Sequence, residues 1–216
     1  MAAGGLERAS GLPPHLARRP FKVLRPVDAR AVYVEPRPEF ARLTDRGVLH
    51  QLATGYYAIV PPEATDRRWL PSLEAAAYGI AAADYGPTVP VLMGLSAARV
   101  LGAIPRALSV AVVAIEKNRP TLDLADREAS VRFVHRDTSR LEAERVETEL
   151  GAALVTTVEQ TLLDLAHLPK VGGVPDEART AVAALWRRAQ PASLAGIAER
   201  QRGKAALARA RGWAEK

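Results

Sequence analysis

The stretch from Arg37 to Pro61 constrains the fold more than any other, because it combines helical spacing, a glycine stop and two short strands. Pro38 suits the first turn of a helix. Phe40 and Leu43 lie three residues apart and therefore share one helix face, and Gly47 follows as a C-cap. The sequence thus predicts a helix that leads directly into a β-hairpin.

The hairpin consists of strands over 48–52 and 56–60, joined by a loop that contains Thr54 and Gly55. Upstream segments complete the pattern: a helical turn at 15–19, a short strand at 21–24 and a second helix at 27–32. Helix, strand, helix, helix and two-stranded wing is the order of a winged helix-turn-helix. We therefore expect a winged helix-turn-helix DNA-binding domain over residues 1–62.

Charge is distributed unevenly along this chain of net charge +6. Residues 1–60 carry 9 Lys/Arg against 5 Asp/Glu, residues 61–186 carry 13 against 17, and residues 187–216 carry 8 against 2. Basic ends flanking an acidic middle favour a polyanion partner, since Lys and Arg contacts to phosphate supply most of the affinity for DNA. The alternative for the C-terminal cluster is a solvated basic surface.

Nine polar side chains of the N-terminal domain are the candidates for DNA contact. Side chains on or beside the third helix would face the major groove of DNA, and those of the hairpin would lie near the wing. Side chains upstream of the third helix would attract the phosphate backbone of DNA. For each arginine the alternative is a solvent-facing residue that pairs with Glu39 or Asp45. The predicted DNA-binding residues are Arg18, Arg19, Lys22, Arg25, Arg37, Arg42, Arg46, His50 and Thr54.

The remainder of the chain, 63–216, predicts an α+β domain with a small mixed sheet. Its most specific strand is the apolar, β-branched run over 108–115, which suits a central strand buried on both faces. A polar linker over 63–72 precedes it, with Trp69 as an anchor. We further expect an amphipathic helix at 73–83, a helix at 95–101, and strands at 131–136, 145–150 and 153–156.

The segment TTVEQTLLDLA, from Thr156 to Ala166, predicts a capped helix. Thr157 with Gln160, or Thr156 with Glu159, has the spacing of a capping box. A further helix is expected from Pro175 to about Ala189, and one or two Arg-rich helical turns over 193–216.

The chain lacks the residues that several functional classes of protein require. The chain has no cysteine, and its four histidines are scattered without a carboxylate or second histidine at ligand spacing, so we expect no metal site. No phosphate-binding loop, dinucleotide fingerprint or nucleophile elbow is present, so we expect no cofactor, no catalytic residues and no enzymatic activity. No apolar run reaches membrane-spanning length, which favours a cytoplasmic protein without a membrane partner.

Taken together, several segments resemble one family, the AbiEi antitoxins of AbiE-type (type IV) toxin–antitoxin systems. The resemblance spans roughly 21–189, and Gln160 stands where the family usually has a basic residue. It is carried by Gly55-Tyr56-Tyr57-Ala58, by the helix from Leu95 to Gly102, by the strand from Val131 to Val134, and by Thr156 to Asp164 followed by Gly172-Gly173.

This resemblance implies two activities. The N-terminal winged helix would repress its own operon by binding inverted repeats in promoter DNA, as cooperative copies or a homodimer, and the C-terminal domain would antagonise a cognate nucleotidyltransferase toxin. Two alternatives stay open. One is a winged-helix transcriptional regulator whose C-terminal domain senses a ligand or dimerises, and the other is an antitoxin that modifies its toxin covalently.

Overall fold

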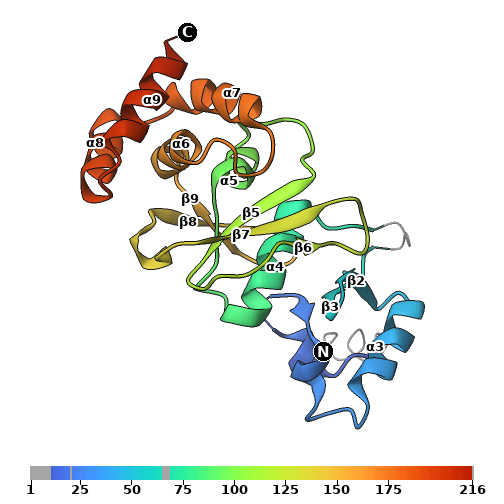
Figure 1. The fold of residues 1–216 in the computed structure, drawn as a ribbon. Helices are drawn as coiled ribbons and strands as arrows, with labels where there is room; N and C mark the ends of the chain where they lie inside the picture. The colour runs from blue at the N-terminus through green and yellow to red at the C-terminus, as the bar shows by residue number, and fades with distance from the viewer. Residues whose placement is uncertain (1–10, 20, 65–68, 216) are drawn as a thin grey trace, which may run out of the picture.

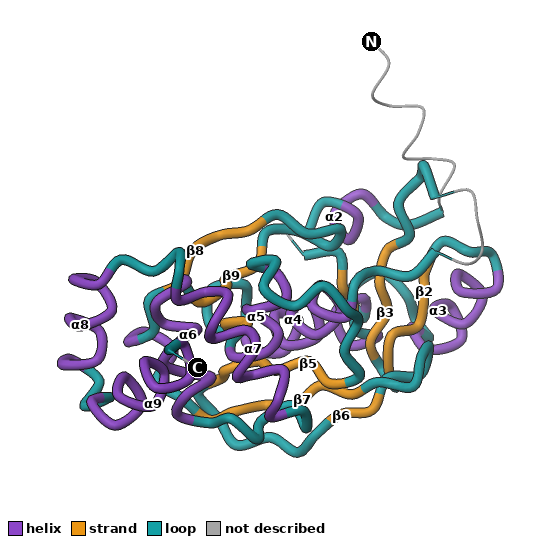
Figure 2. The backbone as a smooth tube through the Cα atoms, turned by 90° about the horizontal axis from the view of Figure 1, so that it is seen from above, coloured by secondary structure: helices purple, strands orange, loops and turns teal. Residues whose placement is uncertain are grey.

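The computed structural model describes residues 11–19, 21–64 and 69–215 of the chain (Figure 1). Within these residues it is an α+β structure, as the sequence predicts, with a three-stranded N-terminal sheet and a six-stranded mixed sheet. We call residues 11–64 the N-terminal unit and residues 69–215 the body. The N-terminal unit and the last helices lie at opposite ends of the molecule in both views (Figures 1 and 2).

The N-terminal unit has the predicted order of elements. Its strands pair antiparallel in the order β1-β3-β2, with Val23 opposite Ala58 and His50 opposite Ala58 on the other side. One prediction here is wrong: the second helix, expected over 27–32, is a single 3₁₀ turn. The elements are α2 (Pro14–Ala17), β1 (Val23–Leu24), η1 (Pro26–Ala29), α3 (Pro36–Asp45), β2 (Leu49–Ala53) and β3 (Tyr56–Ile59).

Asp28 explains why η1 is so short. Its carboxylate accepts hydrogen bonds from the Arg25 backbone N–H at 2.9 Å and from the Arg25 guanidinium, which fixes a tight turn around Pro26. The prolines that follow at 36 and 38 start a new helix instead of continuing this one, because a residue before proline is biased out of the helical region.

Helix α4 (Leu73–Tyr85) is the centre of the molecule and packs against β1 on one side and β5 on the other. Its N-cap is Ser72, whose hydroxyl accepts from the Ala75 N–H. The prediction of an amphipathic helix is wrong, because every residue from Leu73 to Ala82 is buried. Small residues allow this: a Cβ added at Gly79 would lie only 2.4 Å from Cγ2 of Val23.

The six-stranded sheet runs in the order β6-β7-β5-β4-β9-β8, with β5 parallel to β7 and β4 parallel to β9. β5 is buried on both faces as predicted, since Val113 packs towards α4 and Val112 packs into the cluster on the opposite face. The strands are β4 (Val91–Leu92), β5 (Val110–Ile115), β6 (Leu122–Asp123), β7 (Ser130–His135), β8 (Ala143–Val146) and β9 (Ala153–Thr156).

Three differences from the predicted strands have local causes. β4 and β6 are two residues long and were too short to leave an alternating pattern in the sequence. The strand expected at 145–150 is β8, which begins earlier and stops at Val146, because Thr148 and Gly151 close a tight turn with reciprocal backbone hydrogen bonds.

Five helices cover the other face of the sheet and the end of the molecule: α5 (Gly94–Val100), α6 (Val158–His167), α7 (Pro175–Trp186), α8 (Pro191–Arg200) and α9 (Lys204–Ala214). We call α7, α8 and α9 the helical layer. The sequence predicts only one or two turns over 193–216, which is wrong. Pro191 occupies the first turn of α8, where proline is favoured, and does not end the chain's helical structure.

The N-terminal unit and the body share one core. A small cluster that includes Phe40 and Leu43 is internal to the N-terminal unit, but Val23, Leu52 and Ala58 belong to the same buried cluster as α4 and β5. Residues 65–68 of the predicted linker lie outside the described residues, as do residues 1–10. Trp69 packs against the shared cluster, as its predicted role as an anchor requires.

Candidate nucleic-acid interface

Helix α3 presents one face to the core and the opposite face to solvent. Phe40 and Leu43 are completely buried in the small cluster, and the Phe40 ring meets Tyr57 of β3 edge-on at 5.1 Å. Gly47, with a φ of 72°, ends the helix, and the Val48 N–H returns to the Leu43 carbonyl. Arg37, Arg42 and Asp45 of α3 are exposed to solvent.

Four of the predicted DNA-binding residues lie exposed on or beside α3 and on the hairpin loop. Arg37, Arg46 and Thr54 are exposed, and the Arg46 guanidinium lies beside Gly11. Arg42 is 75% exposed and pairs only with Glu39, at 3.3 Å. An exposed ion pair of this kind is worth about 0–1 kcal/mol, so it leaves Arg42 available to phosphate.

The structure places most of the other candidates in contacts within the protein. Lys22 donates from Nζ to the Ala17 carbonyl at 2.6 Å, which ties α2 to β1, and Arg19 pairs with Asp28 at 3.3 Å. Arg18 is exposed, although it too has an interaction within the protein. The sequence gives no sign of these contacts, because the partners come from tertiary packing or from backbone groups.

Arg25 is part of a partly buried cluster around Asp84, at the end of α4. Oδ1 of Asp84 accepts from Arg25 at 2.7 Å, and Oδ2 accepts from Arg119 and from the Tyr56 hydroxyl, each at 2.6 Å. The Arg119 guanidinium also lies 4.2 Å above the ring of Phe133. The cluster joins the N-terminal unit to the body, and Arg25 faces this junction.

His50 forms a second junction. Its Nε2 lies 2.8 Å from Oδ2 of Asp126, and its ring meets Trp69 edge-on at 6.1 Å. Burial acts to raise the pKa of Asp126, but hydrogen bonds from His50 and Arg127 lower it below its usual value. Of the nine predicted DNA-binding residues, Arg37, Arg42, Arg46 and Thr54 therefore remain exposed on or beside α3 and on the hairpin loop.

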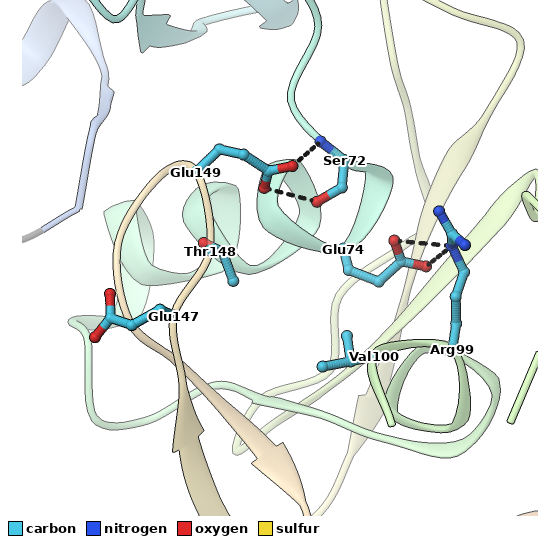
Figure 3. A pocket seen from close by; sticks show the side chains of 7 residues that line it. All are labelled: Ser72, Glu74, Arg99, Val100, Glu147, Thr148 and Glu149. Carbon is cyan, nitrogen blue, oxygen red and sulfur yellow. Dashed lines mark hydrogen bonds and ion pairs between the residues drawn. The ribbon is translucent and has the colours of Figure 1, made fainter. Parts of the chain in front are cut away.

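A hollow of about 510 Å³ in the body lies between α4, α5 and the β8–β9 turn (Figure 3). Its carboxylates mostly have structural partners: Glu149 accepts from the Ser72 hydroxyl at 2.9 Å, and Glu74 pairs with Arg99 at 3.1 Å. Burial raises the pKa of Glu74. Glu74 is 3% exposed.

A buried polar network beneath the helical layer has no counterpart in the sequence predictions. Thr157 caps α6 by accepting from the Gln160 N–H, but the Gln160 side chain does not complete a capping box. It donates to Asp164 at 3.1 Å and exchanges hydrogen bonds with Gln201 at the end of α8. Burial raises the pKa of Asp164 to about 7, against a lowering by Arg136.

No group of three or more His, Asp or Glu side chains within the described residues is arranged to hold a metal ion. Nor does any described helix have the length and apolar character to cross a bilayer.

Comparison with protein-family models gives no match, and comparison with curated proteins gives none either. Among solved structures, the chain is similar to the crystal structure of the RV2827C protein from Mycobacterium tuberculosis, with 20% sequence identity and a TM-score of 0.60. The match covers 97% of this chain and 75% of that chain. At this identity the similarity shows a shared fold and nothing about function.

Proposed function

We propose that this protein is an antitoxin that represses its own operon by binding promoter DNA and antagonises a cognate nucleotidyltransferase toxin. The DNA-binding half of the proposal depends mainly on one observation. Within an N-terminal unit of winged-helix topology, the solvent face of α3 carries Arg37, Arg42 and Arg46, and none of the three is committed to the body. Phosphate and groove contacts from such a helix are the usual mode of winged-helix binding.

The antitoxin half of the proposal depends on the sequence resemblance to the AbiEi antitoxins. In this proposal the body has a non-catalytic role and antagonises the toxin by binding it. The protein would work in the cytoplasm, where both promoter and toxin are found.

A gel-shift titration with the DNA upstream of the protein's own gene tests the repressor role. The double variant Arg42→Ala, Arg46→Ala should bind that DNA about tenfold or more weakly, since each lost phosphate or base contact is worth about 1 kcal/mol or more. Arg132→Ala, which removes an exposed arginine from β7, is the matched control and should bind like the parent chain. Equal binding by both variants would show that α3 is not the groove-facing helix.

Growth rescue tests the antitoxin role separately. Expression of a nucleotidyltransferase encoded beside this gene should arrest growth, and co-expression of this chain should restore it. The Arg42→Ala, Arg46→Ala variant should restore growth equally well, because the proposed toxin antagonism does not use α3. A regulator that only senses a ligand would bind DNA and give no rescue, and a modifying antitoxin would change the mass of the toxin.

A further inference from the structure

We infer that the helical layer carries a docking groove for an acidic segment of a partner protein that inserts one apolar side chain. The groove is a hollow of about 110 Å³ between the end of α7, α8 and α9. One water occupies about 30 Å³ in the liquid, so the hollow has room for a side chain. It is lined by Trp186, Ala189, Pro191, Leu194, Ala195, Leu207 and Arg211.

The lining is apolar at the floor and basic at the rim. Leu194 is 4% exposed and forms the floor, while Trp186 and Leu207 are half-buried and leave part of their surface uncovered. Arg211 lies one helical turn after Leu207 on the same face of α9 and is exposed. No described side chain pairs with the Arg211 guanidinium.

The surrounding charge indicates the chemistry of the partner. From 187 to 215 the chain carries seven arginines and lysines against two glutamates. Arg188 donates to the Leu101 carbonyl and Arg209 to the Ala166 carbonyl, which hold the layer in place, but Arg202, Lys204 and Arg211 are exposed. Such a surface attracts an acidic partner and repels a basic one.

The apolar floor distinguishes a protein partner from nucleic acid. A DNA backbone has no aliphatic side chain with which to fill a hollow lined by Trp186, Leu194 and Leu207, whereas an acidic peptide with a leucine or aromatic anchor matches both floor and rim. The groove lies at the end of the molecule opposite α3 (Figure 1), so this inference is independent of promoter binding.

A peptide selection on the intact chain tests the inference. Random peptides displayed on phage are panned against the immobilised protein, and the selected peptides are synthesised and titrated by Trp fluorescence. We expect peptides rich in Asp and Glu around a large apolar residue, with a blue shift that is lost in Trp186→Phe, because Trp186 lines the groove. Their affinity should also fall as salt rises.

Ala195 offers a matched pair of variants, since it is exposed on α8 and lines the groove. Ala195→Glu should weaken peptide binding about tenfold, whereas Ala195→Lys, of similar size and opposite charge, should bind within about twofold of the parent chain. Arg132→Glu makes a charge reversal away from the groove and should have no effect. Both glutamate and lysine favour helices, so unfolding temperatures should match the parent.

The inference would be overturned by any of these results: no selectable peptide, selected peptides that are basic, equal weakening by Ala195→Glu and Ala195→Lys, or displacement of the peptides by random-sequence duplex DNA. A concentration-dependent dimer that dissociates in Ala195→Glu would identify the occupant as a second copy of the chain and would also overturn it.

Discussion

Two aspartates of the body, one at the junction with the N-terminal unit and one beneath the helical layer, have carboxylates that are satisfied very differently. Asp84, at the junction with the N-terminal unit, accepts from Arg25, Arg119 and the Tyr56 hydroxyl, all within 2.7 Å. Asp164, beneath the helical layer, accepts from Gln160 at 3.1 Å and lies 3.6 Å from Arg136. Its Oδ2 has no hydrogen-bond partner within the described residues.

The surroundings of the two aspartates determine whether each carboxylate is stabilised by cations or is favoured in its protonated form. Around Asp84, two guanidinium groups and a hydroxyl offset the cost of desolvating the carboxylate, so the cluster can fix the N-terminal unit on the body. Asp164 is 2% exposed and has one weak cationic neighbour, so its protonated form is favoured and its charge depends on pH near neutrality. We call the Asp84 cluster the clamp, and we contrast it with Asp164, whose charge depends on pH.

Removing the Asp84 carboxylate should have the largest effect. Asp84→Ala leaves Arg25 and Arg119 without their shared acceptor in a partly buried site, and breaking a charge cluster by removing one partner costs about 3–5 kcal/mol. We therefore expect a loss of about 4 kcal/mol in the free energy of unfolding, measured by urea denaturation. Asp123→Ala, on the exposed edge strand β6, is the control and should change stability by less than about 0.5 kcal/mol. A similar loss of unfolding free energy in both variants would show that the Asp84 cluster does not fix the N-terminal unit on the body.

The second effect is a pH dependence that originates from Asp164. Because its folded-state pKa is raised to about 7 from an ordinary value of 3.8, folding favours the protonated form. This stabilisation is fully present below pH 3.8 and is lost as pH rises to about 7. It should amount to on the order of 4 kcal/mol, since the pKa rises by about three units and each unit corresponds to about 1.4 kcal/mol.

Asp164→Asn isolates this contribution, because the amide is similar in shape and cannot ionise. The variant should be more stable than the parent chain at pH 8 and should lose the decline in stability between pH 4 and 7, which thermal unfolding across that range would measure. The same decline in both proteins would mean that another group titrates there.

The third effect concerns the packing of the N-terminal unit on α4. Gly79→Ala puts a methyl group against Cγ2 of Val23, and overpacking of this kind costs about 1–3 kcal/mol. The double variant Gly79→Ala, Val23→Ala should be more stable than the sum of the two single changes predicts, because the second change removes the clashing methyl groups. Additive losses in a double-mutant cycle would show that β1 does not pack directly on Gly79.

How far the sequence predicts this molecule depends on how local each feature is. The helix at 36–45, the hairpin and the buried strand β5 follow from spacing and glycine positions, and they are confirmed. The Asp84 cluster could not be predicted, because Arg25 lies 59 residues from Asp84 and its nearest sequence neighbours favour a role on the surface. The contact between Gln160 and Gln201 could not be predicted either, because the two residues lie 41 positions apart and only the tertiary fold brings them together.

The smallest expected effect on stability comes from Arg42, which we compare with Arg25 of the Asp84 cluster. Arg42→Ala should change the free energy of unfolding by less than about 0.5 kcal/mol, since its ion pair with Glu39 is exposed. Arg25→Ala should cost about 2 kcal/mol or more, because Asp28 and Asp84 both lose a charged donor. A loss of promoter binding in Arg42→Ala at unchanged stability would then measure a direct DNA contact, whereas a loss in Arg25→Ala would be explained by weakening of the clamp. If Arg25→Ala lost DNA binding at full stability, Arg25 would belong to the interface and the clamp would not depend on it.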